Sequence, residues 1–248
     1  MVILVVNSST LYQERKLISN YLNDARRYLD KDSFSQADNY YKQAVSKAEE
    51  VYHFTNSSSD LEFLLALYEQ IGKFYNHVYA ATNSTNDLAP AASYYEKILY
   101  FREHDLQNCE NINSLRQALE AYIQLIWLSY ELRDKFLFNK YIKQTRKYAK
   151  ALVRKTKKYD DEQYIILANI YAGHFNNLFN QVSKAYYFYY LAYRRLYKIY
   201  KSMPNEGISN DLVNIYNCLI SITYKLGFKK QNKNWQKKLK VLEGTIKK

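Results

Sequence analysis

The chain has 248 residues, of which 48% are apolar, but only five are glycine and two are proline. Hairpins and tight turns depend on those two residue types, so this composition excludes most β-rich folds and predicts an all-α protein. The net charge of +12 is unevenly distributed, because residues 1–124 carry 11 basic and 16 acidic side chains and residues 125–248 carry 25 and 8. Such an asymmetry indicates an acidic partner.

The N-terminal sequence MVILVV is apolar, but it is too short for a signal peptide or a membrane span. Cys109 and Cys218 are far apart, as expected for free thiols in a reducing compartment. We therefore expect a cytoplasmic protein without a membrane span, in which residues 1–10 form a lead-in to the first helix.

An eight-residue pattern, A-x-x-[YF]-Y-x-x-[AI], occurs three times along the chain. It reads ADNYYKQA at 37–44, AASYYEKI at 91–98 and AYYFYYLA at 185–192. Positions 1, 5 and 8 lie on one face of a helix with 3.6 residues per turn. The small residues allow a neighbouring helix to come close, and the tyrosine at position 5 fills the space between them.

The third octet belongs to a tyrosine-rich segment, KAYYFYYLAYRRLYKIY, at residues 184–200. We expect Tyr189, with the alanines at both ends of the octet, to pack against the preceding helix. Tyr186 and Tyr193 are expected to meet the following helix. The pattern determines Tyr187, Tyr190 and Tyr197 less, and together with Arg194 and Arg195 they are candidates for solvent-facing positions.

A second pattern precedes each octet. Residues 68–75 read YEQIGKFY and residues 164–171 read YIILANIY, while Tyr21, Ala25 and Tyr28 have the same spacing. The two patterns together resemble the tetratricopeptide repeat (TPR), in which a W-x2-L-G-x2-Y helix is followed by an A-x3-F helix.

Weaker matches extend the TPR resemblance over most of the chain. Equivalent positions are 42 to 54 residues apart rather than the usual 34, so the repeats are long and irregular. The resemblance implies a right-handed α-solenoid of about five antiparallel helix pairs, forming one domain over residues 11–248. The expected pairs span residues 11–54, 59–106, 112–158, 160–202 and 209–246.

Helix boundaries are predicted from local signals. Ser59 and Glu62 have the spacing of a capping box before a helix at residues 60–81. Ser35 is a candidate start for the second helix, Pro90 suits a first helical turn, and Gly227 suits a helix end.

The sequence contains no phosphate-binding glycine loop, dinucleotide fingerprint or serine-hydrolase elbow. The four histidines have no metal-ligand spacing, and His174 is expected in the turn after a helix. We therefore expect no enzymatic activity, metal or cofactor, although an enzyme or enzyme regulator with an unrecognised site remains an alternative.

The resemblance implies a protein- or peptide-binding adaptor, because in TPR proteins the first helix of each pair lines a concave groove. The groove candidates carried over by register are Arg26, Lys73, Asn76, Trp127, Tyr130 and Asn169. The alternative is that these are ordinary exposed helix residues.

A second functional hypothesis is based on the basic half of the chain, which includes RKYAKALVRKTKK at 146–158 and a lysine-rich tail. It predicts binding of nucleic acid, another polyanion or an acidic protein, or self-association. The candidate contacts are Lys150, Arg154, Lys157 and Lys237. A solvated basic face without a partner is the alternative.

Overall fold

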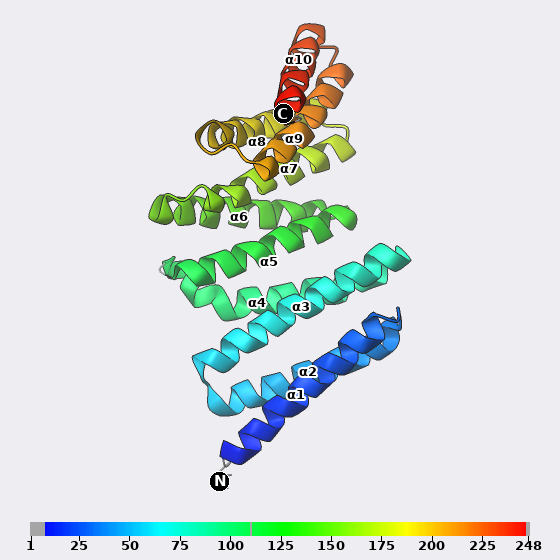
Figure 1. The fold of residues 1–248 in the computed structure, drawn as a ribbon, viewed down its shortest axis with the longest axis vertical. Coiled ribbons are helices and arrows are strands. Elements are labelled where there is room, and N and C mark those ends of the chain that lie inside the picture. Colours follow the sequence, from blue (N-terminus) through cyan, green and yellow to red (C-terminus); the bar gives the residue numbers. More distant parts are fainter. Residues whose placement is uncertain (1–7, 110, 247–248) are drawn as a thin grey trace. The chain divides into compact units, whose positions relative to one another are not determined.

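The computed structural model describes residues 8–109 and 111–246 (Figure 1). These residues form ten α-helices and two short 3₁₀ turns, and contain no strand. The helices pack as pairs of sequence neighbours: α1 with α2, α3 with α4, α5 with α6, α7 with α8 and α9 with α10. The predicted all-α fold of helix pairs is confirmed.

The chain divides into two compact units, residues 1–101 and 102–248. The first contains α1 (Ser8–Leu29), α2 (Phe34–Thr55), α3 (Ser58–Thr82), η1 (Thr85–Asp87) and most of α4 (Leu88–Asn108). The second contains α5 (Ile112–Glu131), α6 (Lys135–Thr156), η2 (Asp160–Glu162), α7 (Gln163–Leu178), α8 (Val182–Ser202), α9 (Glu206–Lys225) and α10 (Lys229–Ile246). Residues 1–7 of the predicted lead-in lie outside the described residues, and α1 already begins at Ser8.

The three octets lie in α2, α4 and α8, at the centre of the core of each of these three helix pairs. Position 5 is a buried tyrosine in each: Tyr41 and Tyr189 are 2% exposed, and Tyr95 is fully buried. The residues at positions 1 and 8 are equally inaccessible, namely Ala37, Ala44, Ala91, Ile98, Ala185 and Ala192. Burying one tyrosine ring removes about 150–250 Å² from water, so these rings contribute strongly to packing.

Glycine allows the closest helix contacts within two of the pairs. A Cβ atom added to Gly72 on α3 would lie 2.6 Å from the ring of Tyr95 on α4. A Cβ atom on Gly173 of α7 would overlap the ring of Tyr189 on α8. Only a residue without a side chain leaves room for the tyrosine ring at these two points.

The tyrosine-rich helix α8 also packs against the helices that follow it. Tyr193 is buried, and its ring centroid lies 5.6 Å from that of Tyr216 and 4.9 Å from that of Trp235. Tyr186 is partly buried and meets Phe228 edge to face at 6.2 Å. The predicted packing role of Tyr186, Tyr189 and Tyr193 is therefore confirmed.

His174 lies within α7, so its predicted position in a turn is wrong. The helix continues through Gly173 and ends at Leu178. The His174 Nδ1 atom is 2.9 Å from the hydroxyl oxygen of Tyr189, and burial lowers the pKa of the imidazole. In the neutral tautomer with an unprotonated Nδ1, the imidazole accepts a hydrogen bond from the Tyr189 hydroxyl; in the other tautomer, Nδ1–H donates to that oxygen.

The start of α3 also differs from the prediction. Ser57 is the N-cap, and its hydroxyl oxygen accepts a hydrogen bond from the backbone N–H of Asp60 at 3.1 Å. The same hydroxyl donates to the Asp60 carboxylate at 2.8 Å. The prediction of a capping box at Ser59 and Glu62 is wrong because the N-cap is Ser57, two residues earlier, and its own backbone N–H donates to the Thr55 hydroxyl at 3.3 Å.

Three other boundary signals have mixed outcomes. Gly227 follows α9 with a φ of +70°, as predicted for a helix end. Pro90 lies in the first turn of α4, also as predicted. However, α2 begins at Phe34, so Ser35 lies inside the helix rather than capping it.

A buried aspartate connects successive pairs in each unit. In the first unit, Arg15 on α1 donates two hydrogen bonds of 2.9 Å to Asp60 at the start of α3. In the second, Arg116 on α5 donates to both carboxylate oxygens of Asp161 in η2, at 2.9 and 3.0 Å. Both pairs are separated by 45 residues, so the same contact recurs once in each unit.

None of the helices in the described part of the chain is long and apolar enough to cross a membrane.

Candidate binding cleft

The connection between α6 and α7 positions one wall of a cleft in the second unit. After α6 ends, Lys157 adopts a left-handed conformation with a φ of 53°, and its backbone N–H donates to the carbonyl of Val153. The chain then turns through η2, which brings Tyr159 and Glu162 to the C-terminal half of α8. Side chains of α8 that are three or four residues apart face them from one side of the helix.

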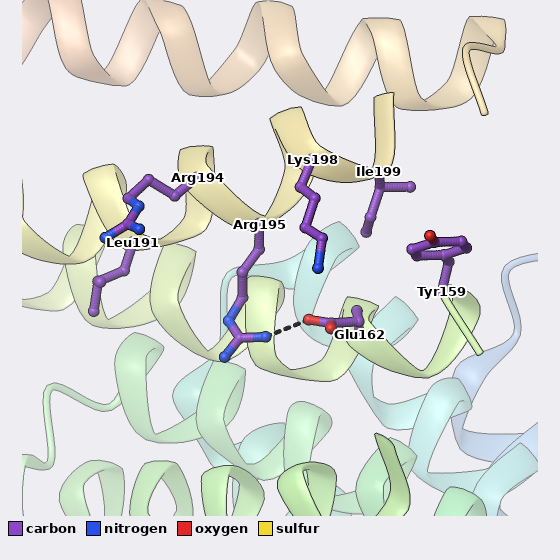
Figure 2. Close-up of a pocket in the computed structure, with 7 residues that line it drawn as sticks. All are labelled: Tyr159, Glu162, Leu191, Arg194, Arg195, Lys198 and Ile199. Carbon is purple, nitrogen blue, oxygen red and sulfur yellow. Dashed lines mark hydrogen bonds and ion pairs between the residues drawn. The ribbon is translucent and has the colours of Figure 1, made fainter. Parts of the chain in front are cut away.

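The first part of the cleft is a basic pocket of about 320 Å³ (Figure 2). Its lining residues are Tyr159, Glu162, Leu191, Arg194, Arg195, Lys198 and Ile199. Arg195 forms an ion pair with Glu162, but among the described residues neither Arg194 nor Lys198 has a carboxylate within 4.0 Å. Two cations therefore remain available to a ligand.

The cations occupy different positions along α8. Figure 2 shows Lys198 pointing toward Glu162, with the Tyr159 ring beyond it, while Arg194 lies at the other end of the pocket beside Leu191. Lys198 is thus the cation next to the wall formed by Tyr159 and Ile199.

The second part of the cleft is an apolar pocket of about 250 Å³ between α7, α8 and the start of α9. It shares Tyr159 and Ile199 with the basic pocket, so the two pockets adjoin. Its apolar lining comprises Ile166, Leu167, Ile170, Leu196, Ile199, Met203 and Ile208. Ile166, Leu196 and Ile199 are already buried in the core, so the apolar surface open to a ligand comes mainly from Leu167, Ile170, Met203 and Ile208.

Two carboxylates also line the apolar pocket. Asp160 comes from η2 and Asp211 from α9. Partial burial against the apolar lining raises the pKa of Asp211 above its ordinary value. A positively charged ligand group beside this carboxylate would stabilise its ionised form.

The groove residues predicted in the first unit do not line this cleft. Arg26 is exposed on α1, and Lys73 on α3 forms an ion pair of 2.5 Å with Glu69. Asn76 donates to the hydroxyl of the buried Tyr95 at 3.2 Å, so its amide helps to fix a core residue.

The groove residues predicted in the second unit also lie outside the cleft. Asn169 is only 3% exposed, and its amide oxygen accepts a hydrogen bond of 2.8 Å from Arg146. Trp127 and Tyr130 are partly buried on α5. None of the three groove candidates in the second unit therefore lines the cleft.

The four basic candidates are accessible but dispersed. Lys150 and Arg154 are exposed one turn apart on α6, and Lys157 follows at the end of that helix. Lys237 is exposed on α10, which Figure 1 shows on the other side of α7, α8 and α9 from α6.

The cleft itself was not predicted. Arg194 is exposed and Arg195 is half-buried, so the expectation that both face solvent holds for Arg194, and the spacing of the two with Lys198 is the available signal for a basic pocket. That spacing does not reveal that Glu162 pairs with only one of the three cations. It also does not reveal the apolar pocket, because its residues come from three helices and a turn.

No protein-family model and no curated protein matches the sequence. Among solved structures, the chain is similar to BtubC (BKLC) from P. vanneervenii, with a TM-score of 0.64 and 15% sequence identity over 96% of this chain and 92% of that one. It is also similar to a circular tandem repeat protein, with a TM-score of 0.48 and 10% identity over 96% of this chain and 60% of the other. A de novo designed helical repeat protein gives a TM-score of 0.41 at 14% identity, over 94% of this chain and 97% of that one. The similarity to BtubC, over nearly the whole of both chains, shows a helical-repeat fold.

Proposed function

We propose that the chain is a non-enzymatic TPR-like scaffold that binds a peptide segment of a partner protein in the cleft between η2, α7, α8 and α9. The observation that carries this proposal is that a basic pocket and an apolar pocket adjoin. In the basic pocket, Arg194 and Lys198 have no carboxylate partner among the described residues. Peptide sites typically combine apolar pockets with a few polar groups that fix orientation.

The helical-repeat fold supports the same role. Stacked helix pairs provide an extended surface that partners bind without any chemical step. The TPR resemblance also supports peptide binding, because such repeats bind extended peptides. The proposed cleft is lined by other residues than the groove candidates predicted from the sequence.

A selection from a random-peptide display library on the immobilised chain tests this proposal. We expect selected peptides to bind at least tenfold more weakly to an Arg194→Glu/Lys198→Glu variant. Lys229→Glu/Lys230→Glu is the matched control, because it makes the same charge change at exposed positions of α10. Equal binding of the selected peptides to all three proteins would contradict the proposal.

A second candidate function is polyanion binding by α6. The observation that favours it is the exposure of Lys150 and Arg154 one turn apart, in the half of the chain that carries 25 basic and 8 acidic side chains. This contact would lie outside the cleft.

A further inference from the structure

The charges of the cleft are divided between its two pockets. Lys198 and Arg194 line the basic pocket, and Asp160 and Asp211 line the apolar pocket; Asp160 follows the shared Tyr159, whereas Asp211 comes from α9, which contributes no residue to the basic pocket. Tyr159 and Ile199 belong to both pockets and mark the junction. A ligand that spans both pockets therefore meets the cations in one pocket and apolar surface with the α9 carboxylate of Asp211 in the other.

We infer that the cleft selects peptide segments in which one or two large apolar residues separate an acidic from a basic residue. This inference rests on the proposed function and specifies its ligand. The acidic side chain would contact Lys198 or Arg194, the apolar residues would cover Ile170 and Ile208, and the basic side chain would lie beside Asp211.

Charge complementarity is the reason for choosing this ligand. A purely acidic segment would place a carboxylate near Asp160 and Asp211, where like charges repel each other. A purely basic segment would meet the same repulsion at Arg194 and Lys198. Nucleic acid carries repeated negative charge, and so it is disfavoured by the acidic side of the cleft.

The two pockets are expected to contribute differently to affinity. Exposed ion pairs are weak, so removing one charge from the peptide should weaken binding about two- to fivefold. Removal of two leucine side chains from the apolar pocket should weaken it at least tenfold, since each buried leucine contributes more than a surface ion pair.

A panel of capped, fluorescently labelled hexapeptides tests the inference by fluorescence anisotropy with the full chain. The reference peptide is Gly-Glu-Leu-Leu-Lys-Gly, measured together with its reversed sequence because the chain direction of a bound peptide is not fixed by the pocket charges. Matched peptides replace both charges by glutamine, both leucines by serine, the glutamate by lysine, or the lysine by glutamate.

Of the reference peptide and its reversed sequence, we expect one to bind more tightly than every other peptide of the panel. The peptide with serine in place of both leucines should bind least tightly. A charge exchange provides the sharper measurement. Arg194→Glu/Lys198→Glu should prefer the peptide with two lysines, whereas Asp211→Lys should prefer the peptide with two glutamates. Distortion of the cleft alone would weaken all peptides together and would not exchange these preferences.

Two outcomes would overturn the inference. One is equal affinity of the wild-type chain for all charge variants of the peptide. The other is tighter binding of a six-nucleotide single-stranded DNA that is lost in Arg194→Glu/Lys198→Glu. If library peptides still bind in the cleft but lack the acidic–apolar–basic order, the inference fails while the proposed function stands.

Discussion

Tyr189 is the residue on which the contact between α7 and α8 most depends. Its ring is 2% exposed, covers Gly173, and places its hydroxyl 2.9 Å from His174. We expect Tyr189→Ala to lower the free energy of unfolding by roughly 3–5 kcal/mol, as large-to-small changes of core aromatic residues do. Chemical denaturation followed by circular dichroism measures this difference.

Tyr190 is the matched control for Tyr189, because it is the next residue on the same helix but is 37% exposed. We expect Tyr190→Ala to cost less, about 1–2 kcal/mol, because Tyr190 is partly exposed and its ring touches those of Tyr186, Tyr193 and Trp235 only from the side of the core. Similar denaturation midpoints for the two variants would show that the octet position does not determine the packing of α8.

We expect Gly173 to be required because a side chain there would collide with a neighbouring ring, and not because of its backbone conformation. Alanine has a higher helix propensity by up to ~1 kcal/mol, but its Cβ atom would overlap the Tyr189 ring. Overpacking of this kind costs roughly 1–3 kcal/mol, so Gly173→Ala should destabilise the chain in a thermal melt.

Gly244 provides the opposite case. It lies inside α10, and a Cβ atom there would have no neighbour within 4 Å. Gly244→Ala should therefore stabilise the chain by about 0.5–1 kcal/mol in the same melt. If both alanine variants changed stability in the same direction, the steric explanation for Gly173 would be wrong.

At the scale of elements, the contact between Arg116 and Asp161 connects α5 to η2, the turn that forms one wall of the cleft. The hydrogen bonds from Arg116 lower the pKa of the Asp161 carboxyl, whose side chain is 3% exposed. Because the folded pKa lies below the unfolded value near 3.8, this contribution is fully present above that value. It is lost as the pH falls through the folded pKa.

We expect Arg116→Met to reduce stability by roughly 1–3 kcal/mol at pH 7, since it leaves a buried carboxylate without its main partner. The difference from the wild type should shrink as the pH falls below about 4, where Asp161 becomes protonated in the variant and then in the wild type. Thermal melts at pH 7, 5 and 3 measure both effects.

Arg27→Met is the control for this prediction, because the pair of Arg27 with Asp24 is exposed at both ends. It should change stability little at any of these pH values. A loss in Arg116→Met that stays the same at pH 7 and pH 3 would mean that packing of the arginine, and not its charge, stabilises η2.

The helix pairs could be predicted from the sequence, whereas the cleft could not. Tyr41, Tyr95 and Tyr189 repeat a local pattern, and local periodicity determines which helix face is buried. The cleft depends on contacts between distant residues, such as the pair of Glu162 with Arg195. The hydrogen bond from Arg146 to the buried Asn169 could not be predicted either, because it joins two different helices and neither helix carries a sequence pattern for it.

At the scale of the whole molecule, the excess of positive charge lies in residues 125–248. We expect wild-type affinity for a short single-stranded oligonucleotide to be weak and to fall steeply as salt rises. Replacing Lys150, Arg154, Lys157 and Lys237 by glutamate should reduce the slope of log affinity against log salt by up to about 3, at roughly 0.7 per lost phosphate contact. An unchanged slope would show that these four residues do not contact the polyanion.

The central claim is that a partner peptide lies in the cleft between η2, α7, α8 and α9. Hydrogen–deuterium exchange of the full chain, with and without a library-selected peptide, tests it most directly. We predict slower exchange on peptide binding in the segment from Tyr159 to Ile170, in the C-terminal half of α8 and at the start of α9. Protection confined to α1, α3 and α5, which carry most of the predicted groove residues, would contradict the claim.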